Sequence, residues 1–418
     1  MIMTRWVLYL FCFEILCFSG GQRFFVENNL PTLVVWLLTC GGIFIISEVQ
    51  SEREFDWVGW LKGSFPVFVL MLWTLLSTIV VNEVADFSYL SYILFPLGML
   101  FSLCCFDFHR VRDCLLKLLS WLMAVSIVVH IGSNADILPA ELIDDGEKVV
   151  SMSLYFFNVG WGELDFLPMA RFSSIYWEPG QCQIIIMYVL VLFTDDIQQH
   201  LYDILYLIRR YGILVLAILL TGSTTGYLVF ALFVCCILLF NGNVLSQRKI
   251  LPFFFSAILA VGVFSFFYLS DVVQSKLEQS DSLSDENSFA IRMADNLACF
   301  TVAVENPVFG LGVNSDALNA DLSTFGNTTA SNGWLFSAAQ MGFVYIGIMF
   351  MAMYLTIRKM HLGMLAFLPL LILILSQANE YATFFPVMWL YCCPISVITS
   401  AAEQLSVNST GSKPVNSR

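Results

Sequence analysis

Long apolar runs recur along almost the whole chain and constrain its fold more than any other feature. Runs of about 17–25 residues are long enough to cross a bilayer as helices. The composition agrees, because 58% of the residues are hydrophobic and only 12% are charged, whereas soluble domains carry about 25% charged residues. We therefore predict an all-α polytopic membrane protein with about 12 transmembrane helices, over residues 4–19, 30–47, 65–81, 89–106, 115–133, 179–194, 211–222, 226–241, 250–269, 333–356, 362–378 and 385–401.

The basic residues lie mostly on one side of these predicted spans. Because cytoplasmic loops are enriched in Lys and Arg, we predict that both termini are cytoplasmic and that two long loops, 134–179 and 270–332, lie outside. Residues 1–401 then form a single polytopic membrane domain, and residues 402–418 form a disordered cytoplasmic tail. In this orientation the outer segments contain only five basic residues, which are Arg23, Lys148, Arg171, Lys276 and Arg292.

The weakest predicted spans are 211–222 and 226–241, which meet at the small polar turn Thr221–Gly226. A single long helix would place Arg209–Arg210 and Arg248–Lys249 on opposite sides of the membrane. A tight helical hairpin keeps both pairs inside, and we therefore prefer the hairpin.

The first apolar run also fits a signal peptide with cleavage near Ser19–Gly21. Glu14 interrupts the run, and the charge alternation along the chain is better when this run is retained as a span. We therefore expect it to remain part of the protein.

Composition also argues against several classes of function. A net charge of −13 is unsuited to nucleic-acid binding, which requires a basic surface. The cysteines lie almost entirely in or beside apolar runs, with neither a disulfide framework nor a zinc spacing. The four histidines are scattered, so we expect no metal and no other cofactor.

Both predicted outer loops carry features beyond simple connection. The first contains an aromatic-rich segment, 149–167, which we expect to lie at the surface of the outer leaflet. The second contains the segment 288–304, which we predict to be an amphipathic helix packed against the membrane domain and ended by Pro307. The residues expected near one face of that helix are Phe289, Met293, Asn296, Phe300 and Ala303.

Four short stretches within and beside these loops are the candidates for function. They are Arg171–Gly180 (RFSSIYWEPG), Arg292–Asn296 (RMADN), Asn306–Asn314 (NPVFGLGVN) and Ala330–Trp334 (ASNGW). In order and spacing they resemble the superfamily of bacterial O-antigen polymerases and O-antigen ligases. Its members commonly show an Arg-Phe-Ser/Gly stretch ending in Pro before a mid-chain span, an Arg-led helix, a Pro-x-x-Gly-x-Gly turn and an Asn ahead of a span. The turn Gly222–Gly226 is similar too, although the arginine often found there is absent.

The resemblance implies a substrate and a location. Superfamily members act on oligosaccharide repeat units carried on a polyprenyl pyrophosphate, at the periplasmic face of the bacterial inner membrane. It also implies a multi-pass enzyme with a GT-C-like arrangement of helices, for which the sugar–phosphate bond of the donor supplies the energy.

Site residues follow from the matching positions. Arg171 and Arg292 are expected to stabilise the pyrophosphate leaving group, because an arginine fork binds developing negative charge well. The alternative is that each arginine contacts lipid headgroups or pairs with a nearby carboxylate. Glu178 is the candidate general base, and the alternative is that it favours the dipole of the following helix. The candidates for substrate binding are Trp177, Asn314 and Asn332, and the candidates for structural turns are Gly310 and Gly312.

The chain departs from the superfamily pattern in two places. In the ligase branch a histidine commonly precedes the asparagine ahead of the span, but Ser331 occupies that position and neither long outer loop contains a histidine. This favours a polymerase. A polymerase pattern of Arg followed at one fixed distance by Gly is not met either, because Arg171–Gly180 and Arg292–Gly310 differ in spacing.

We therefore predict a polymerase that joins lipid-linked repeat units into O-antigen or a similar surface polysaccharide. One alternative is an O-antigen ligase that transfers polysaccharide to lipid A-core. Another is a polysaccharide flippase, although the long outer loops and the few charges within the spans argue against a transporter. The expected partners are the lipid bilayer, the lipid-linked oligosaccharide, a chain-length regulator and a flippase.

Overall fold

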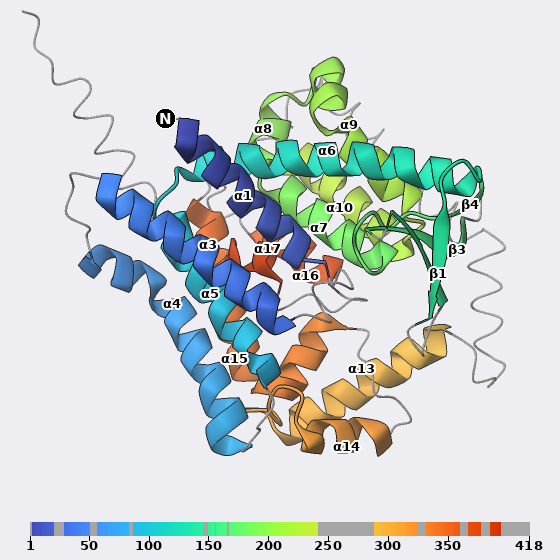
Figure 1. Ribbon diagram of the computed structural model, residues 1–418. Helices are drawn as coiled ribbons and strands as arrows, with labels where there is room; N and C mark the ends of the chain where they lie inside the picture. Colours follow the sequence, from blue (N-terminus) through green and yellow to red (C-terminus); the bar gives the residue numbers. More distant parts are fainter. Residues whose placement is uncertain are drawn as a thin grey trace, which may run out of the picture.

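The computed structural model is mostly helical (Figure 1). It describes residues 2–20, 29–50, 57–82, 87–144, 149–154, 156–164, 167–240, 288–324, 332–359, 367–377 and 385–393. Up to the first outer loop the helices are α1 (Ile2–Phe18), α3 (Asn29–Gln50), α4 (Trp57–Leu75), α5 (Ser91–Leu103) and α6 (Phe108–Asn134). A π-helical turn, η1 (Leu76–Val81), extends α4, and a short 3-10 turn, η2 (Phe87–Leu90), precedes α5.

The helices after the first outer loop form the rest of the bundle and the second outer loop. They are α7 (Pro179–Val191), α8 (Thr194–Gln199), α9 (Ile204–Leu220), α10 (Thr224–Phe240), α13 (Ser288–Glu305), α14 (Asp316–Thr324), α15 (Gly333–Ile357), α16 (Phe367–Ser376) and α17 (Pro386–Trp389). Helix α7 is buried along almost its whole length, because α6, α9, α10, α16 and α17 all pack against it.

The predicted spans correspond to helices wherever the structure describes them. Each predicted span other than 250–269 contains a helix over at least part of its range, and 250–269 lies outside the described residues. Among the described residues, four stretches are long and apolar enough to cross a membrane, namely Leu30–Ser47, Trp57–Val81, Phe108–Asn134 and Gly333–Ile357. The remaining helices are shorter, so the structure supports a multi-pass helical membrane protein while the number of twelve spans and their orientation stay predictions.

The first outer loop corrects the all-α prediction. It forms an antiparallel sheet in the order β1-β2-β3-β4, at the right of Figure 1, where we had expected an aromatic segment at the leaflet surface. The strands are β1 (Ala140–Asp144), β2 (Val149–Ser153), β3 (Phe157–Leu164) and β4 (Leu167–Arg171). Asp145-Gly146 between the first two strands is a hairpin signal, and the Val and aromatic residues around it favour strands.

The predicted hairpin at Thr221–Gly226 is confirmed. Helix α9 ends at Leu220 and α10 begins at Thr224, with Gly222 at a positive φ of 60° in the turn. Helix α10 packs against α8, and Tyr206 near the start of α9 donates a hydrogen bond to Asp196 of α8. Helix α10 therefore runs back toward the start of α9. Arg248–Lys249, whose predicted cytoplasmic position also favoured the hairpin, lie outside the described residues.

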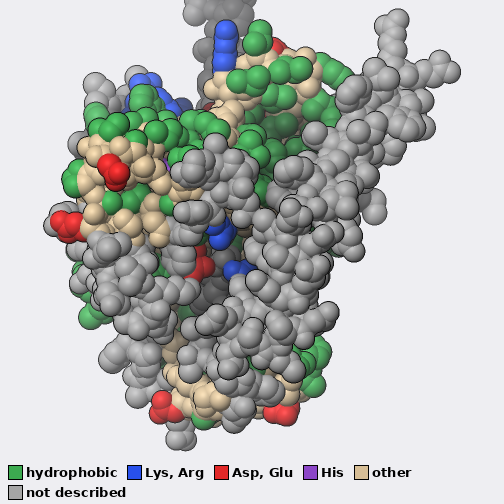
Figure 2. Space-filling model, turned by 90° about the vertical axis from the view of Figure 1, so that its right-hand side faces the viewer, with side chains coloured by type: hydrophobic (Ala, Val, Ile, Leu, Met, Phe, Trp, Pro, Cys, Tyr) green, Lys and Arg blue, Asp and Glu red, His purple; other side chains and the backbone are tan. Residues whose placement is uncertain are grey.

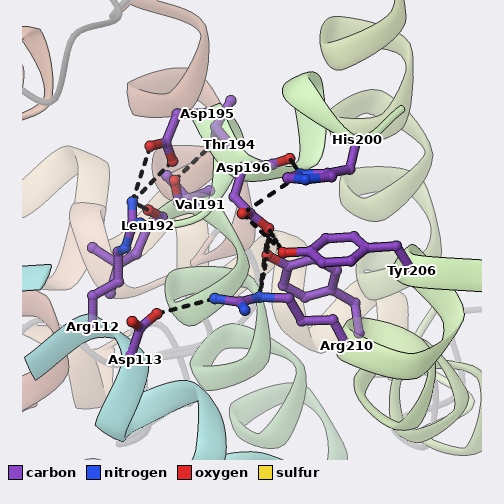
Figure 3. A network of polar contacts seen from close by, with 11 residues as sticks. Arg112, Asp113, Val191, Leu192, Thr194, Asp195, Asp196, His200, Tyr206 and Arg210 are labelled. Atoms are coloured by element: carbon purple, nitrogen blue, oxygen red, sulfur yellow. Dashed lines mark hydrogen bonds and ion pairs between the residues drawn. The ribbon is translucent and has the colours of Figure 1, made fainter. Parts of the chain in front are cut away.

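At the opposite end of α9 from this turn, a polar network ties α6, α8 and α9 together (Figure 3). Arg112 pairs with Asp195 at 2.9 Å, and Arg210 lies 3.0 Å from Asp113 and 3.5 Å from Asp196. The Phe193 ring lies near both guanidinium groups, 4.6 Å from that of Arg112 and 5.4 Å from that of Arg210. The network therefore fixes the helix ends that the charge distribution predicts to be cytoplasmic.

We expect Asp196→Asn to lower the free energy of unfolding by about 1–3 kcal/mol, because its carboxylate pairs with Arg210 and accepts charge-assisted hydrogen bonds from two tyrosine hydroxyl groups. The side chain of Asp196 is 16% exposed and accepts hydrogen bonds from the hydroxyl groups of Tyr206 and Tyr211. Asp113→Asn is the matched control, since that carboxylate is 59% exposed and should contribute less than about 1 kcal/mol. Thermal unfolding of the detergent-solubilised protein measures both, and equal losses would contradict the prediction.

The helix predicted over 288–304 is confirmed as α13, but one residue of its expected packing face, Phe300, does not pack as predicted. The side chains of Phe289 and Met293 lie outside the described part of the structure. Ala298, Cys299 and Val302 are buried against α14 and α15, and Ala303 is buried as predicted. Phe300, placed on the packing face by its spacing, is 49% exposed. The small size of the buried residues explains the difference, because it lets α13 approach α15 closely.

Candidate functional site

Arg171 ends β4 and lies against the turn between α9 and α10. Its Nε donates a hydrogen bond of 3.0 Å to the carbonyl oxygen of Thr221, and the backbone N–H of Phe172 donates to the carbonyl oxygen of Leu220 at 2.9 Å. The arginine side chain is half-buried. The guanidinium group is therefore held at the C-terminal end of α9, whose C-cap residue is Thr221, where the helix dipole favours a positive charge.

Two polar side chains on one face of α6 hold the backbone next to Arg171. His130 and Asn134 are four residues apart, and so they lie one above the other on the helix. The Nε2 atom of His130 is 2.9 Å from the carbonyl oxygen of Ala170, and the backbone N–H of Ala170 donates to the Oδ1 atom of Asn134 at 2.8 Å. Because a carbonyl oxygen only accepts, Nε2 of His130 carries the hydrogen. Both backbone groups of the residue before the arginine are thus bound by α6.

The segment after Arg171 is packed from inside by Asn158 of β3. The Nδ2 atom of Asn158 donates to the carbonyl oxygen of Tyr176 at 2.6 Å, and its backbone N–H donates to that of Ser174 at 2.8 Å. Ser174 has a positive φ of 59°, and its hydroxyl group lies 2.7 Å from that of Ser126 on α6. This segment is therefore a buried, tightly bonded connection to α7.

Trp177 and Glu178 stand at the end of this connection. Both side chains are half-buried, and the backbone N–H of Trp177 donates to the carbonyl oxygen of Gly20 at 3.1 Å. Glu178 is the N-cap residue of α7, but its carboxylate makes no hydrogen bond to the amides of the first turn. Its position suits the alternative role of a carboxylate at a helix N-terminus.

The Pro-x-x-Gly-x-Gly turn of the second loop is inserted beside a break in α15. Gly342 has φ 81° and ψ 165°, so the helix is interrupted there and its carbonyl groups are freed. The N–H of Leu311 donates to the carbonyl oxygen of Ala339 at 2.9 Å, and that of Gly312 to the carbonyl oxygen of Gln340 at 2.8 Å. The turn thus replaces the helical hydrogen bonds that the break removes.

Gly310 and Gly312, the two candidates for structural turns, both have left-handed backbone conformations. Their φ angles are 64° and 86°, a region that glycine adopts without strain. A Cβ atom at Gly310 would lie 2.4 Å from the backbone carbon of Gln340. The hydroxyl group of Ser77, in the π-helical turn η1, donates to the carbonyl oxygens of Phe309 and Gln340, so α4 holds the same junction.

The two predicted asparagines have different surroundings. Asn332 is the N-cap residue of α15, and its Oδ1 atom accepts hydrogen bonds from the backbone N–H groups of Trp334 and Leu335 at 3.0 and 3.1 Å. Capping alone accounts for an asparagine there. Asn314 is exposed, with a positive φ of 50°, a conformation that asparagine tolerates. Binding of substrate by either residue stays a prediction.

Arg292 lies near the start of α13 with its side chain half-buried. Within the described part of the chain it forms no ion pair or hydrogen bond. Helix α13 and the sheet that ends at Arg171 both lie at the right of Figure 1. Figure 2 looks onto that side and shows Lys or Arg side chains gathered with an acidic side chain in a hollow. This face therefore carries charged side chains of both signs.

Gln377, at the end of α16, connects the α7 and α15 parts of the site. It is completely buried; its side-chain amide donates to the hydroxyl group of Tyr188 on α7, and its carbonyl oxygen accepts from the N–H of Gly333 at 3.3 Å. Through these bonds Gln377 connects α7, which begins beside Glu178, with α15, which Asn332 caps.

His130, Asn134 and Gln377 are not among the site residues predicted from the sequence. The sequence does contain a signal for His130 and Asn134, because polar residues at a spacing of four within an apolar span indicate a polar helix face. Gln377 is a single polar residue near the end of a predicted span, where reaching the interface is an ordinary explanation. In the described ranges no three His, Cys, Asp or Glu residues are grouped closely enough to hold a metal ion.

We expect Asn134→Ala to lower the free energy of unfolding by about 1 kcal/mol and to reduce activity, because the backbone beside Arg171 loses a hydrogen-bond acceptor. Asn134→Asp is the matched control, since it keeps an acceptor for the N–H of Ala170 and should restore most of the stability. Thermal unfolding and product yield per amount of membrane-inserted protein measure the two effects. Equal behaviour of the two variants would show that this hydrogen bond does not position the arginine.

Taken together, the helices and their apolar lengths define a multi-pass helical membrane protein. The model of the O-antigen ligase family matches residues 211–350, which is less than half of the chain. This match supports the superfamily of O-antigen polymerases and ligases without distinguishing the two activities. It includes Arg292, Gly310, Gly312, Asn314 and Asn332, whereas Arg171, Trp177 and Glu178 lie outside it. No match was found among curated proteins or among solved structures.

Proposed function

We propose that the protein polymerises polyprenyl-pyrophosphate-linked oligosaccharide repeat units into O-antigen or a similar surface polysaccharide, at the periplasmic face of the bacterial inner membrane. The superfamily match supports a role in surface polysaccharide assembly. The placement of Arg171 is the observation that supports this part of the protein as the site of the reaction. Three parts of the protein, namely α6, β3 and the α9–α10 turn, hold its backbone and its Nε atom.

The guanidinium group of Arg171 is suited to the donor's pyrophosphate. In the proposed reaction the bond between the anomeric carbon and the pyrophosphate oxygen breaks, and a new bond forms from that carbon to an acceptor hydroxyl oxygen. The polyprenyl pyrophosphate leaves with the bonding electron pair. An arginine already held in place stabilises this charge without reorganising during the reaction, and Arg292 supplies a second positive charge from α13.

The proton of the acceptor hydroxyl group needs a base within hydrogen-bond reach. Glu178 is our candidate, because it follows Arg171 along the same bonded segment and stands at the N-terminus of α7. We further propose that Trp177, Asn314 and Asn332 contact the sugars. A chain-length regulator and a flippase are the proposed protein partners, since the product must be limited in length and its precursors must cross the membrane.

The proposal is tested in a strain that lacks this gene, by resolving the surface-polysaccharide ladder on a gel. Lipid A-core that carries a single repeat unit is the expected result, because flipping and ligation survive when polymerisation is lost. Restoration of the ladder by the wild-type gene is the control. Bare core without any repeat unit would contradict the polymerase and indicate a ligase or a flippase.

An O-antigen ligase is the second candidate, and the description of the matching family favours it. The sequence has Ser331 where the ligase branch commonly has histidine, and Ser331 lies outside the described residues. Incubating the purified protein with lipid-linked repeat units separates the two activities. A polymerase lengthens the units without lipid A-core, whereas a ligase gives product only when lipid A-core is added.

A further inference from the structure

Helix α13 has an apolar stripe that no described residue covers. Leu297, Phe300 and Val304 are 60%, 49% and 52% exposed, and their spacing of three and four residues places them along one side of the helix. Val308, just beyond the helix end, is 45% exposed. The opposite side of α13 is already packed against α14 and α15, so the stripe is a second, separate apolar surface.

This stripe is continuous with the outer surface of α15. The ring of Phe300 lies 6.4 Å from that of Phe343, and Phe343 and Val344 are 38% and 40% exposed. Both residues follow the break at Gly342, in one of the helices long and apolar enough to cross a membrane. The stripe on α13 and the outer surface of α15 after Gly342 therefore form one apolar surface, and the same surroundings contact both.

The end of α4 indicates the depth at which the stripe lies. The Phe309 ring stacks on Trp73 of α4 with ring centroids 4.9 Å apart, which places the turn after α13 beside the last turns of that helix. The η1 residues Val80 and Val81, which end the same candidate span, are 66% and 49% exposed. Helix α13 also lies across the direction of α4 in Figure 1, as a helix parallel to a membrane surface does.

We propose that α13 is an interfacial helix whose stripe Leu297–Phe300–Val304–Val308 is immersed in the hydrocarbon of the outer leaflet. Lipid is the occupant that fits, because the stripe is apolar, it joins the surface of a candidate membrane span, and it lies at the end of a second such span. Amphipathic helices with one apolar side bind membranes in this way.

The lipid contact of α13 also affects Arg292, which is on the same helix but outside the stripe. A helix anchored at this depth keeps the arginine near the lipid headgroups, which is where the pyrophosphate of a polyprenyl carrier lies. This consequence rests on the proposed function, whereas the lipid contact itself does not.

The test places an environment-sensitive fluorescent amino acid at position 300 or 304 of the full-length protein in phospholipid vesicles. Ser323 on α14, which is exposed, is the control position. Quenching by nitroxides attached to the lipid acyl chains is compared with quenching by soluble iodide. Positions 300 and 304 are both exposed, so the substitutions leave the packed side of α13 intact, and monodisperse elution in detergent confirms folding.

We expect lipid nitroxides to quench positions 300 and 304 at least about twofold more than position 323, and iodide to show the reverse order. Quenching of position 300 by iodide alone would mean that the stripe faces water. Protection from both quenchers would mean that protein covers it. Either result would overturn the proposal, and neither depends on polymerase activity, so the proposed function is tested separately.

Discussion

Replacing Arg171 by alanine is expected to lower the rate of polysaccharide synthesis about 100- to 1,000-fold, the loss typical for removing one preorganised donor from a site of developing negative charge. The structure provides the reason for so large an effect. Arg171 is held at Thr221 through Nε, and its neighbour Ala170 is bound on both backbone groups by α6. Little reorganisation is therefore needed when the leaving group develops its charge.

The measurement is polymer formed per amount of membrane-inserted protein, with lipid-linked repeat units as substrate. Arg209→Ala is the matched control, because this exposed arginine lies on the far part of α9 from the site; it should leave the rate unchanged. Arg171→Lys should recover only part of the activity, since an ammonium group cannot reproduce the planar fork of an arginine. Full activity of Arg171→Ala with normal stability would remove this residue from the proposed site.

Gly342→Ala is expected to produce the largest loss of stability, about 3 kcal/mol or more, since strain at a glycine-only conformation adds to a steric clash. Gly342 has φ 81° and ψ 165°, and a Cβ atom built there would lie 2.1 Å from the carbonyl oxygen of Val308. The backbone around Val308 cannot withdraw easily, because the N–H of Phe343 donates to the carbonyl oxygen of Pro307 at 2.8 Å.

Gly347→Ala, five residues further along the same helix, is the matched control and has the opposite expected sign. A Cβ atom at Gly347 would meet nothing within 4 Å, and alanine within a helix is favoured over glycine by about 0.5–1 kcal/mol. Thermal unfolding of both variants in the same detergent measures the difference. A Gly342→Ala protein as stable as Gly347→Ala would show that the break in α15 is not required.

The helices, the α9–α10 turn and the glycine turn could be predicted because each depends on local chemistry. Apolar runs of sufficient length form helices, and Gly310 and Gly312 occupy conformations that other residues resist. The sheet after α6 was missed, although Asp145-Gly146 signalled a hairpin, because its aromatic residues also suited a membrane surface. Phe300 was placed wrongly on the packing face of α13 because spacing alone does not show which of two apolar sides meets another helix.

The sequence by itself determined that this is a multi-pass helical membrane protein and which short stretches carry the resemblance to polysaccharide polymerases and ligases. Hydropathy and charge act along the chain, so they can be read from it directly. Only the tertiary structure brought His130 and Asn134 of α6 to the backbone beside Arg171, and only it paired the glycine turn with the break at Gly342. Those contacts join residues far apart in sequence, and they depend on how apolar surfaces pack rather than on any local pattern.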